Sequence, residues 1–163
     1  MAWARGFSEH GREGELMSDL SYDTDVYAWA QYQAQALRAK DWSALDVENL
    51  AEEIESLGKE QAHAVESHLR ILLAHLLKWQ YQPERRRPSW ERSCLNARDE
   101  IDRRLRRNPS LRGQVAQFIA DIYPKARRLA QAETGLPLAT FPEDCPWAAA
   151  QVLDDDFFPG ETN

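Results

Sequence analysis

The sequence lacks several features that would place a chain of 163 residues in a class at once. It has no run of about 18 uncharged apolar residues, the length that a membrane-spanning helix requires. Residues 1–20 contain no continuous apolar segment, so we expect no cleaved secretory signal. The two cysteines, Cys94 and Cys145, are far apart and form no Cys-x-x-Cys pair. We therefore expect reduced thiols and a cytoplasmic protein that does not associate with membranes.

The sequence is also poor in the motifs of common enzymes. With seven glycines, it holds no Gly-x-Gly-x-x-Gly, no phosphate-binding P-loop and no Gly-x-Ser-x-Gly. A di-metal carboxylate bundle needs a Glu-x-x-His motif from each of two helices, whereas His63 precedes Glu66 in the reverse order. We therefore expect no metal ion and no other cofactor, and we favour a protein that is not an enzyme. Catalytic residues stay unassigned.

Charge is plentiful but unevenly distributed. The net charge of −7 argues against general binding to nucleic acids, although it does not exclude a local basic patch. Residues 41–60 hold seven acidic side chains and one lysine, whereas residues 84–112 hold ten arginines and five acidic side chains. The acidic and the basic segment could contact each other or a partner, and the sequence leaves both alternatives open.

Hydrophobic periodicity predicts an all-α fold. Apolar residues recur in steps of three and four, and no segment shows the alternation of a β-strand. Five helices are expected, followed by an irregular proline-rich C-terminal strap with one short helix. The expected ranges are 24–37, 46–57, 62–82, 89–105 and 109–134, with the short helix at 147–152. We predict a disordered extension over residues 1–20 and a single helical-bundle domain over residues 21–160.

Start and stop signals set the expected helix boundaries. Asp23 or Thr24 should cap the first helix and Asp46 the second. Gly58 should separate the second helix from the third, and Ser89 should cap the fourth helix. Pro83 should end the third helix, Asn108 and Pro109 should start the fifth, and Gly135 should end it.

Six blocks of the sequence carry a resemblance to a known family. They read YDTDVYAWA, LDVENLAEEIESLGKEQ, LLAHLLKWQYQPERR, NPSLR, AETGLPLATFPEDCPW and VLDDDFFP. In this order they resemble a bacterial family catalogued as domain of unknown function number twenty-nine, over about residues 22–159. The resemblance implies an all-helical bacterial protein and carries over no functional residues.

The candidate binding site lies where the third helix ends, in the stretch HLLKWQYQPERRRPSW from His75 to Trp90. Three consecutive arginines follow two aromatic residues there. Arginine side chains can bind phosphate groups, and aromatic side chains can stack on nucleic-acid bases. We favour an intramolecular clasp between these arginines and the acidic helix. The candidate residues are Glu52, Glu53, His75, Tyr81, Gln82, Arg85, Arg86 and Arg87.

Other arginines need no ligand, because Asp99–Arg103, Glu100–Arg104 and Asp102–Arg106 are acid-first pairs at i,i+4 on a helix. We expect these three pairs to form a solvated surface.

The function favoured by the sequence is a binding or interaction module, with an unidentified protein as its partner. One alternative is a nucleic-acid-associated protein that uses the arginine-rich corner, although we expect no general binding at physiological salt. Another is a hydrolase or metalloenzyme, with Glu52 or Glu53 as base, His75 as acid or ligand, and Arg86 binding an anion. The oligomeric state stays open.

Overall fold

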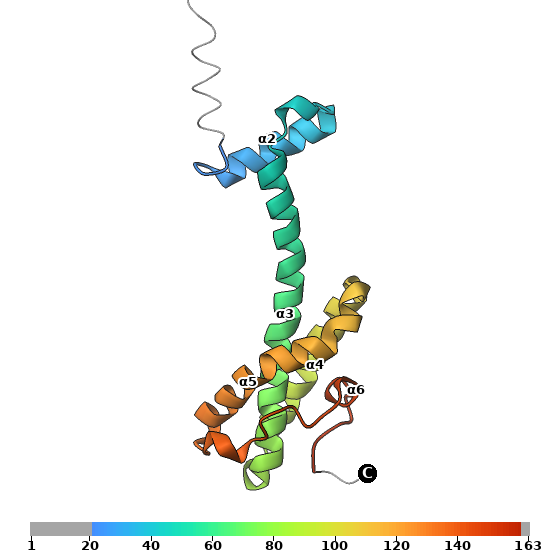
Figure 1. The fold of residues 1–163 in the computed structure, drawn as a ribbon. Coiled ribbons are helices and arrows are strands. Elements are labelled where there is room, and N and C mark those ends of the chain that lie inside the picture. The colour runs from blue at the N-terminus through green and yellow to red at the C-terminus, as the bar shows by residue number, and fades with distance from the viewer. Residues whose placement is uncertain (1–20, 161–163) are drawn as a thin grey trace, which may run out of the picture. The chain divides into compact units, whose positions relative to one another are not determined.

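The computed structural model describes residues 21–160, and the predicted N-terminal extension lies outside them (Figure 1). The described part contains five α-helices and no strand, which confirms the all-α fold. The α-helices are α2 (Val26–Ala39), α3 (Val47–Tyr81), α4 (Pro88–Arg107), α5 (Val115–Thr134) and α6 (Ala149–Val152). Short 3-10 helices cover Trp42–Ala44, Pro83–Arg85, Pro109–Gln114 and Leu138–Thr140. None of the described helices combines the length and the apolar character needed to cross a membrane.

Helix α3 runs through Gly58, so the predicted break at this residue is wrong. An isolated glycine costs about 1 kcal/mol relative to alanine in a helix, which good helix formers on both sides can offset. Leu57 and Lys59 flank it, and it has no positive φ of the kind that ends helices. The chain nevertheless divides into two compact units whose boundary in sequence lies between Leu57 and Gly58.

The first unit is built on α2 and the start of α3. Asp25 caps α2, because its carboxylate accepts from the Ala28 N–H at 2.9 Å, so the cap follows the two predicted residues, Asp23 and Thr24. The buried Trp29 indole donates to Asp46 Oδ2 at 3.1 Å. Asp46 also caps α3 as predicted, accepting from the Asn49 N–H at 3.3 Å. These hydrogen bonds, first of all the one from the Asn49 side chain, lower the pKa of Asp46.

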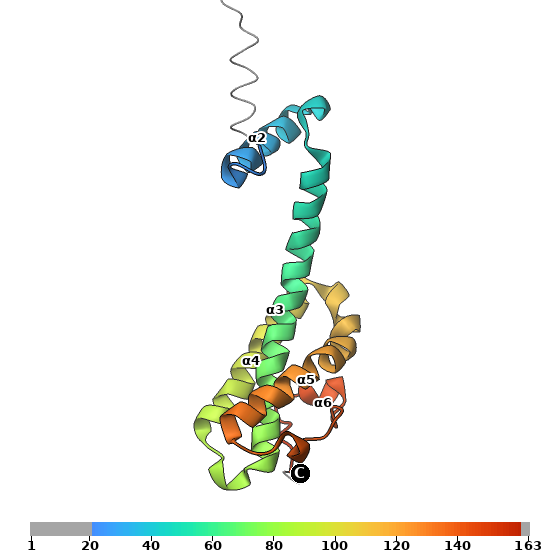
Figure 2. The same ribbon diagram turned by 60° about the vertical axis from the view of Figure 1, so that its left-hand side comes forward.

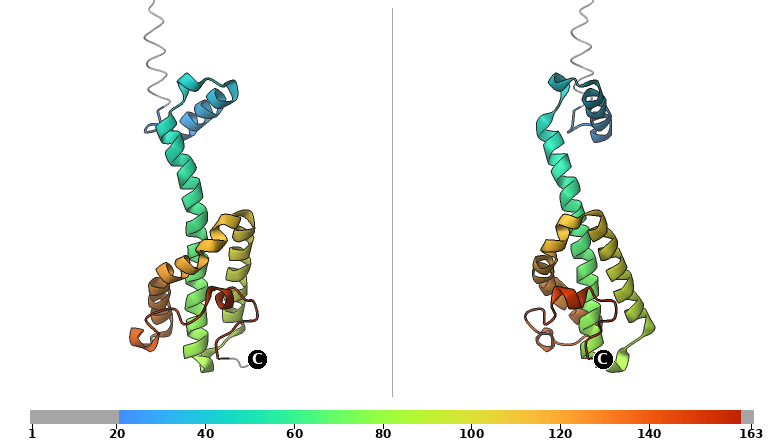
Figure 3. Two further views of the ribbon diagram at one scale, coloured as in Figure 1. Left: turned by 45° about the vertical axis from the view of Figure 1, so that its right-hand side comes forward. Right: turned by 90° about the vertical axis from the view of Figure 1, so that its right-hand side faces the viewer.

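The second unit holds the hydrophobic core. Helix α4 runs beside the C-terminal half of α3, and α5 crosses this half obliquely (Figures 2 and 3). The sequence predicts a buried seam in steps of three and four from Ala62 to Trp79. Four residues of this seam, Val65, Leu69, Leu72 and Leu76, are at 0% exposure. Pro83 follows the end of α3, and Gly135 ends α5 with a φ of 74°, as their residue types predict.

The predicted cap of α4 is wrong, and the predicted helix start at Asn108 and Pro109 is met only by a 3-10 helix. Helix α4 begins at Pro88, so Ser89 is not its cap; the fixed φ of proline suits the first helical position. Asn108 does not cap with its side chain, which donates to the Arg104 carbonyl at 3.0 Å. Pro109 opens a 3-10 helix, and α5 follows only at Val115.

The C-terminal strap, residues 136–160, belongs to the second unit and packs on its helices. Phe141, Trp147 and Val152 are buried in its core, and α6 lies within the range predicted for the short helix. These anchors are large and apolar, so each burial removes much surface from water. The strap is therefore part of the core.

Candidate functional site

The middle arginine of the predicted corner is a structural residue of the second unit. Arg86 is half-buried, and its Nε donates to the Trp79 carbonyl at 3.0 Å. Its Nη2 donates to the Pro159 carbonyl at 3.5 Å, and its guanidinium lies 4.9 Å from the centroid of the Trp79 ring. The Trp79 carbonyl belongs to the last turn of α3, where carbonyls have no partner within the helix. Arg86 therefore joins the end of α3 to the strap, while Arg85 and Arg87 are exposed.

The aromatic and amide residues of the corner are also engaged within the chain. Trp79 is 8% exposed and packs against Phe158, with ring centroids 4.7 Å apart. Tyr81 meets Phe141 edge to face at 5.4 Å, and the buried Gln82 donates to the Thr134 carbonyl at 3.3 Å. Stacking with a nucleic-acid base requires an accessible ring face. The geometry of this corner favours a helix junction.

The two acidic candidates lie on α3 in the first unit. Glu52 is exposed, whereas Glu53 is half-buried and accepts a hydrogen bond of 2.5 Å from the Tyr22 hydroxyl. This bond raises the pKa of Tyr22, because ionising the phenol would place two negative charges together. The clasp between Arg86 and Glu53 stays a prediction.

His75 lies at the edge of the core near an ion pair between the buried Lys78 and the exposed Glu133. Its Nδ1–H donates to the Ile71 carbonyl at 2.9 Å, and burial lowers its pKa. On the same helix, Lys78 is 5% exposed and donates to Glu133 at 2.5 Å. The Lys78 ammonium also lies 4.5 Å from the centroid of the Trp90 ring. A buried lysine needs such partners, so these contacts account for its burial.

Neither cysteine has the features of a reactive nucleophile. Burial raises the pKa of Cys94 to about 12, and burial also raises the pKa of Cys145. A thiol of this kind stays protonated at neutral pH and reacts slowly. Within residues 21–160, no group of three His, Cys, Asp or Glu side chains is arranged to hold a metal ion.

The arginines of α4 form the expected ion-paired surface, with a different pairing. Arg106 binds Asp102 at 2.5 Å, as predicted at i,i+4. Arg103 pairs with Glu100 at i,i+3, so the predicted Asp99–Arg103 and Glu100–Arg104 pairs are wrong. Spacings of three and four both bring side chains together on a helix, and the choice between them depends on side-chain conformation.

Arg98 is an important residue that the sequence reasoning missed. It is 2% exposed, and it donates to three backbone carbonyls of the strap: Val152 at 3.0 Å, Asp155 at 3.2 Å and Phe157 at 2.7 Å. Its position was a usable signal, because Arg98 is four residues after the buried Cys94 and so shares its helix face. Arg98 holds the C-terminal strap on α4.

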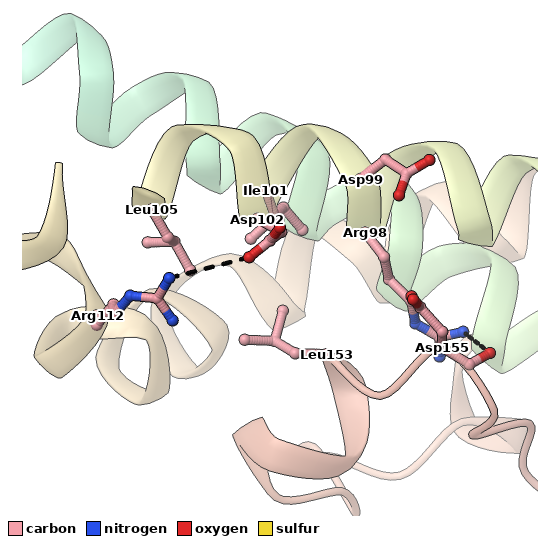
Figure 4. A pocket seen from close by; sticks show the side chains of 8 residues that line it. All are labelled: Arg98, Asp99, Ile101, Asp102, Leu105, Arg112, Leu153 and Asp155. Carbon is pink, nitrogen blue, oxygen red and sulfur yellow. Dashed lines mark hydrogen bonds and ion pairs between the residues drawn. The ribbon is translucent and has the colours of Figure 1, made fainter. Parts of the chain in front are cut away.

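A cavity of about 320 Å³ lies beside Arg98, between α4 and the strap (Figure 4). Arg112 and Asp102 face each other across one end, 3.9 Å apart, and Arg98 lies against Asp155 at the other. Arg98 is held by backbone carbonyls, and Arg112 is paired with a carboxylate. The cavity therefore shows no convergent set of groups for a ligand.

The most unusual surface is apolar and lies in the first unit. We call Val47, Leu50, Ala51, Ile54 and Leu57 the N-terminal apolar stripe. These five apolar residues precede Gly58 in the helix expected over 46–57, and the helical period predicts that they share one face; their spacing does place them on one face of α3. Val47 and Ile54 are each 67% exposed and Leu57 is 61% exposed. Part of a helix-packing stripe is thus open to solvent.

Two large aromatic side chains of the same unit are also exposed. Tyr27 on α2 is 77% exposed, and Trp42, in the turn between α2 and α3, is 65% exposed. Tyrosine and tryptophan contribute strongly to binding energy at protein interfaces. Their exposure adds two potential anchors to the unit that carries the stripe.

A family model described as "Domain of unknown function DUF29" matches residues 21–158. No curated protein and no solved structure matches this chain.

Proposed function

Since the chain belongs to the DUF29 family, whose description names no activity, we propose its function from its own surface. We propose a protein-binding module of the bacterial cytoplasm, with the N-terminal apolar stripe as its binding surface. The observation that carries the proposal is the exposure of Val47, Ile54 and Leu57 on one helix face.

The exposed apolar side chains of the stripe lie together on one helix face and do not occur as isolated residues. Isolated apolar residues on a surface are common and need no explanation, whereas contiguous patches mark interaction sites. Burying a whole aliphatic side chain stabilises by about 1.5–3 kcal/mol. Covering Val47, Ile54 and Leu57, each about two-thirds exposed, would contribute roughly 3–6 kcal/mol before the cost of association.

The arginine-rich corner supports a nucleic-acid function less well. Arg86 donates to two backbone carbonyls, and Trp79 is buried against Phe158. A site for single-stranded nucleic acid combines free cations with exposed aromatic faces. These contacts favour the protein-binding function.

The experiment that tests the proposal is affinity capture from a native bacterial lysate. The full chain serves as bait beside the double variant Ile54→Ser, Leu57→Ser. The matched control is Ile71→Ser, Leu95→Ser, because these two residues are on the second unit and are 37% and 36% exposed. All three baits should give the same far-ultraviolet circular dichroism.

We expect a protein that the parent and the control retain and the stripe variant loses. Such a protein should then bind in purified form with at least a tenfold weaker affinity for the stripe variant. Equal capture by the three baits would contradict the assignment of the stripe as the binding surface.

A further inference from the structure

We propose that the N-terminal apolar stripe binds a basic amphipathic helix of another protein. The inference rests on the protein-binding function proposed above and adds the chemical class of the partner. It draws on the charge of the first unit, the arrangement of its carboxylates and the geometry of the stripe.

Residues 21–57, the described part of the first unit, carry most of the net negative charge of the protein. Residues 21–57 hold eight acidic side chains and two basic ones, Arg38 and Lys40, which gives a net charge of −6. The whole chain has a net charge of −7. The potential around the stripe is therefore negative, and it attracts a cationic partner and speeds its association.

Carboxylates border the stripe on both sides. At 100° per residue, the stripe extends from Leu57 to Ala51 and covers about 120° of the helix surface. Glu48 lies about 60° beyond Ala51, and Glu53 lies about 40° beyond Leu57. Glu55 lies about 40° beyond Ala51, on the same side as Glu48. Glu48 and Glu55 are exposed, and Glu53 accepts from Tyr22. An apolar strip with acidic borders fits a helix whose apolar face is flanked by lysine or arginine.

The dimensions of the stripe suit a short helix. Val47 and Leu57 are separated by ten helical residues, a length of about 15 Å along the axis. A partner helix of three to four turns would cover this length with its own residues at i, i+3, i+4 and i+7. The stripe therefore fits helix-on-helix packing, with aliphatic side chains on both sides.

A second copy of the chain fits this surface poorly. Residues 21–57 of that copy would also carry a net charge of −6, and symmetric pairing would oppose glutamates to glutamates. Like charges brought together across an interface oppose association. The same charge repels nucleic acid from this unit.

The test uses a fluorescein-labelled 14-residue peptide of leucine and lysine with helical amphipathic spacing. Two control peptides accompany it: a scrambled peptide of the same composition and one with glutamate in place of lysine. Binding to the full-length protein is followed by fluorescence anisotropy at about 50 mM and about 500 mM salt. The protein variants are Ile54→Ser, Leu57→Ser for the stripe, Glu48→Gln, Glu55→Gln for its border, and Ile71→Ser, Leu95→Ser as control.

We expect the amphipathic lysine peptide to bind with at least tenfold higher affinity than either control peptide. The stripe variant should lose at least tenfold in affinity, and the control variant should change less than twofold. The border variant should lose about threefold at low salt and show a weaker dependence on salt. Equal binding of the scrambled peptide, or tighter binding of the glutamate peptide, would overturn the proposal.

Analytical ultracentrifugation of the parent protein tests whether a second copy of the chain covers the stripe. A concentration-dependent dimer that the stripe variant lacks would make a second copy the occupant and overturn the proposal. If lysate capture depends on the stripe while the peptide result is negative, the partner class is wrong and the protein-binding function stands. If neither depends on the stripe, the proposed function itself is wrong.

Discussion

Replacing Arg98 with alanine should destabilise the protein by about 3–5 kcal/mol. Arg98 donates three hydrogen bonds to the strap, to the carbonyls of Val152, Asp155 and Phe157. Leaving a buried polar group without its partner costs about 1–3 kcal/mol. The bond to Val152 is buried and the other two are partly buried, so water can replace the latter at about 1 kcal/mol each.

Two further contributions modify this sum in opposite directions. The guanidinium lies 5.2 Å from the Phe158 ring centroid, and that contact is lost with the side chain. Burial lowers the pKa of Arg98, which means that the buried charge carries a desolvation cost that alanine removes.

The measurement is urea unfolding followed by far-ultraviolet circular dichroism. Arg98→Lys should recover less than half of the loss, because one ammonium group cannot reproduce the planar set of donors that meets three carbonyls. Arg106→Ala is the control, since Arg106 is exposed and pairs with Asp102 on the same helix. This change should cost no more than about 0.5 kcal/mol.

Two results would refute the reasoning. A loss below about 1 kcal/mol for Arg98→Ala would mean that the strap does not depend on these hydrogen bonds. Full recovery by Arg98→Lys would mean that the charge matters and the bond geometry does not.

Three further predictions concern titratable groups and the arginine-rich corner. The predicted clasp requires a coupling free energy of at least about 0.5 kcal/mol in a double-mutant cycle of Arg86→Ala and Glu53→Ala, and additive losses would contradict it. Burial lowers the pKa of His75, so the unfolded chain takes up the proton first, and the free energy of unfolding should decrease as the pH falls below about 6.5. His75→Gln should weaken this dependence between pH 7.5 and 5.5, and an unchanged slope would argue against it. Cys94 should resist Ellman's reagent at pH 8 in the folded protein, whereas both Cys94 and Cys145 should react with the reagent in guanidinium. Two thiols that react fast before unfolding would contradict the Cys94 pKa of about 12.

Much of the helical architecture could be predicted from the sequence, because helix formation depends on near neighbours. The apolar spacing of Val65, Leu69 and Leu72 predicts a buried helix face, and all three are fully buried. Asp46 and Gly135 act at the helix ends that their residue types predict. Such signals operate within a single helical turn, so a single sequence contains them.

The break at Gly58 shows the limit of such local signals. Glycine permits a helix to end, but it does so only where the backbone adopts the left-handed conformation, as Gly135 does with a φ of 74°. Gly58 is within α3 instead. A residue type limits which conformations the backbone can adopt, and the surrounding sequence and contacts determine which of them it adopts.

The partners of the candidate site depended on the tertiary structure. Arg98 and Val152 are 54 residues apart, and Arg86 and Pro159 are 73 residues apart, so only the folded strap brings them together. Periodicity likewise predicted an apolar face at Ile54 and could not predict that this side chain would be 67% exposed. A pattern within one helix determines which face is apolar, whereas what covers that face depends on segments far away in the chain or on another molecule.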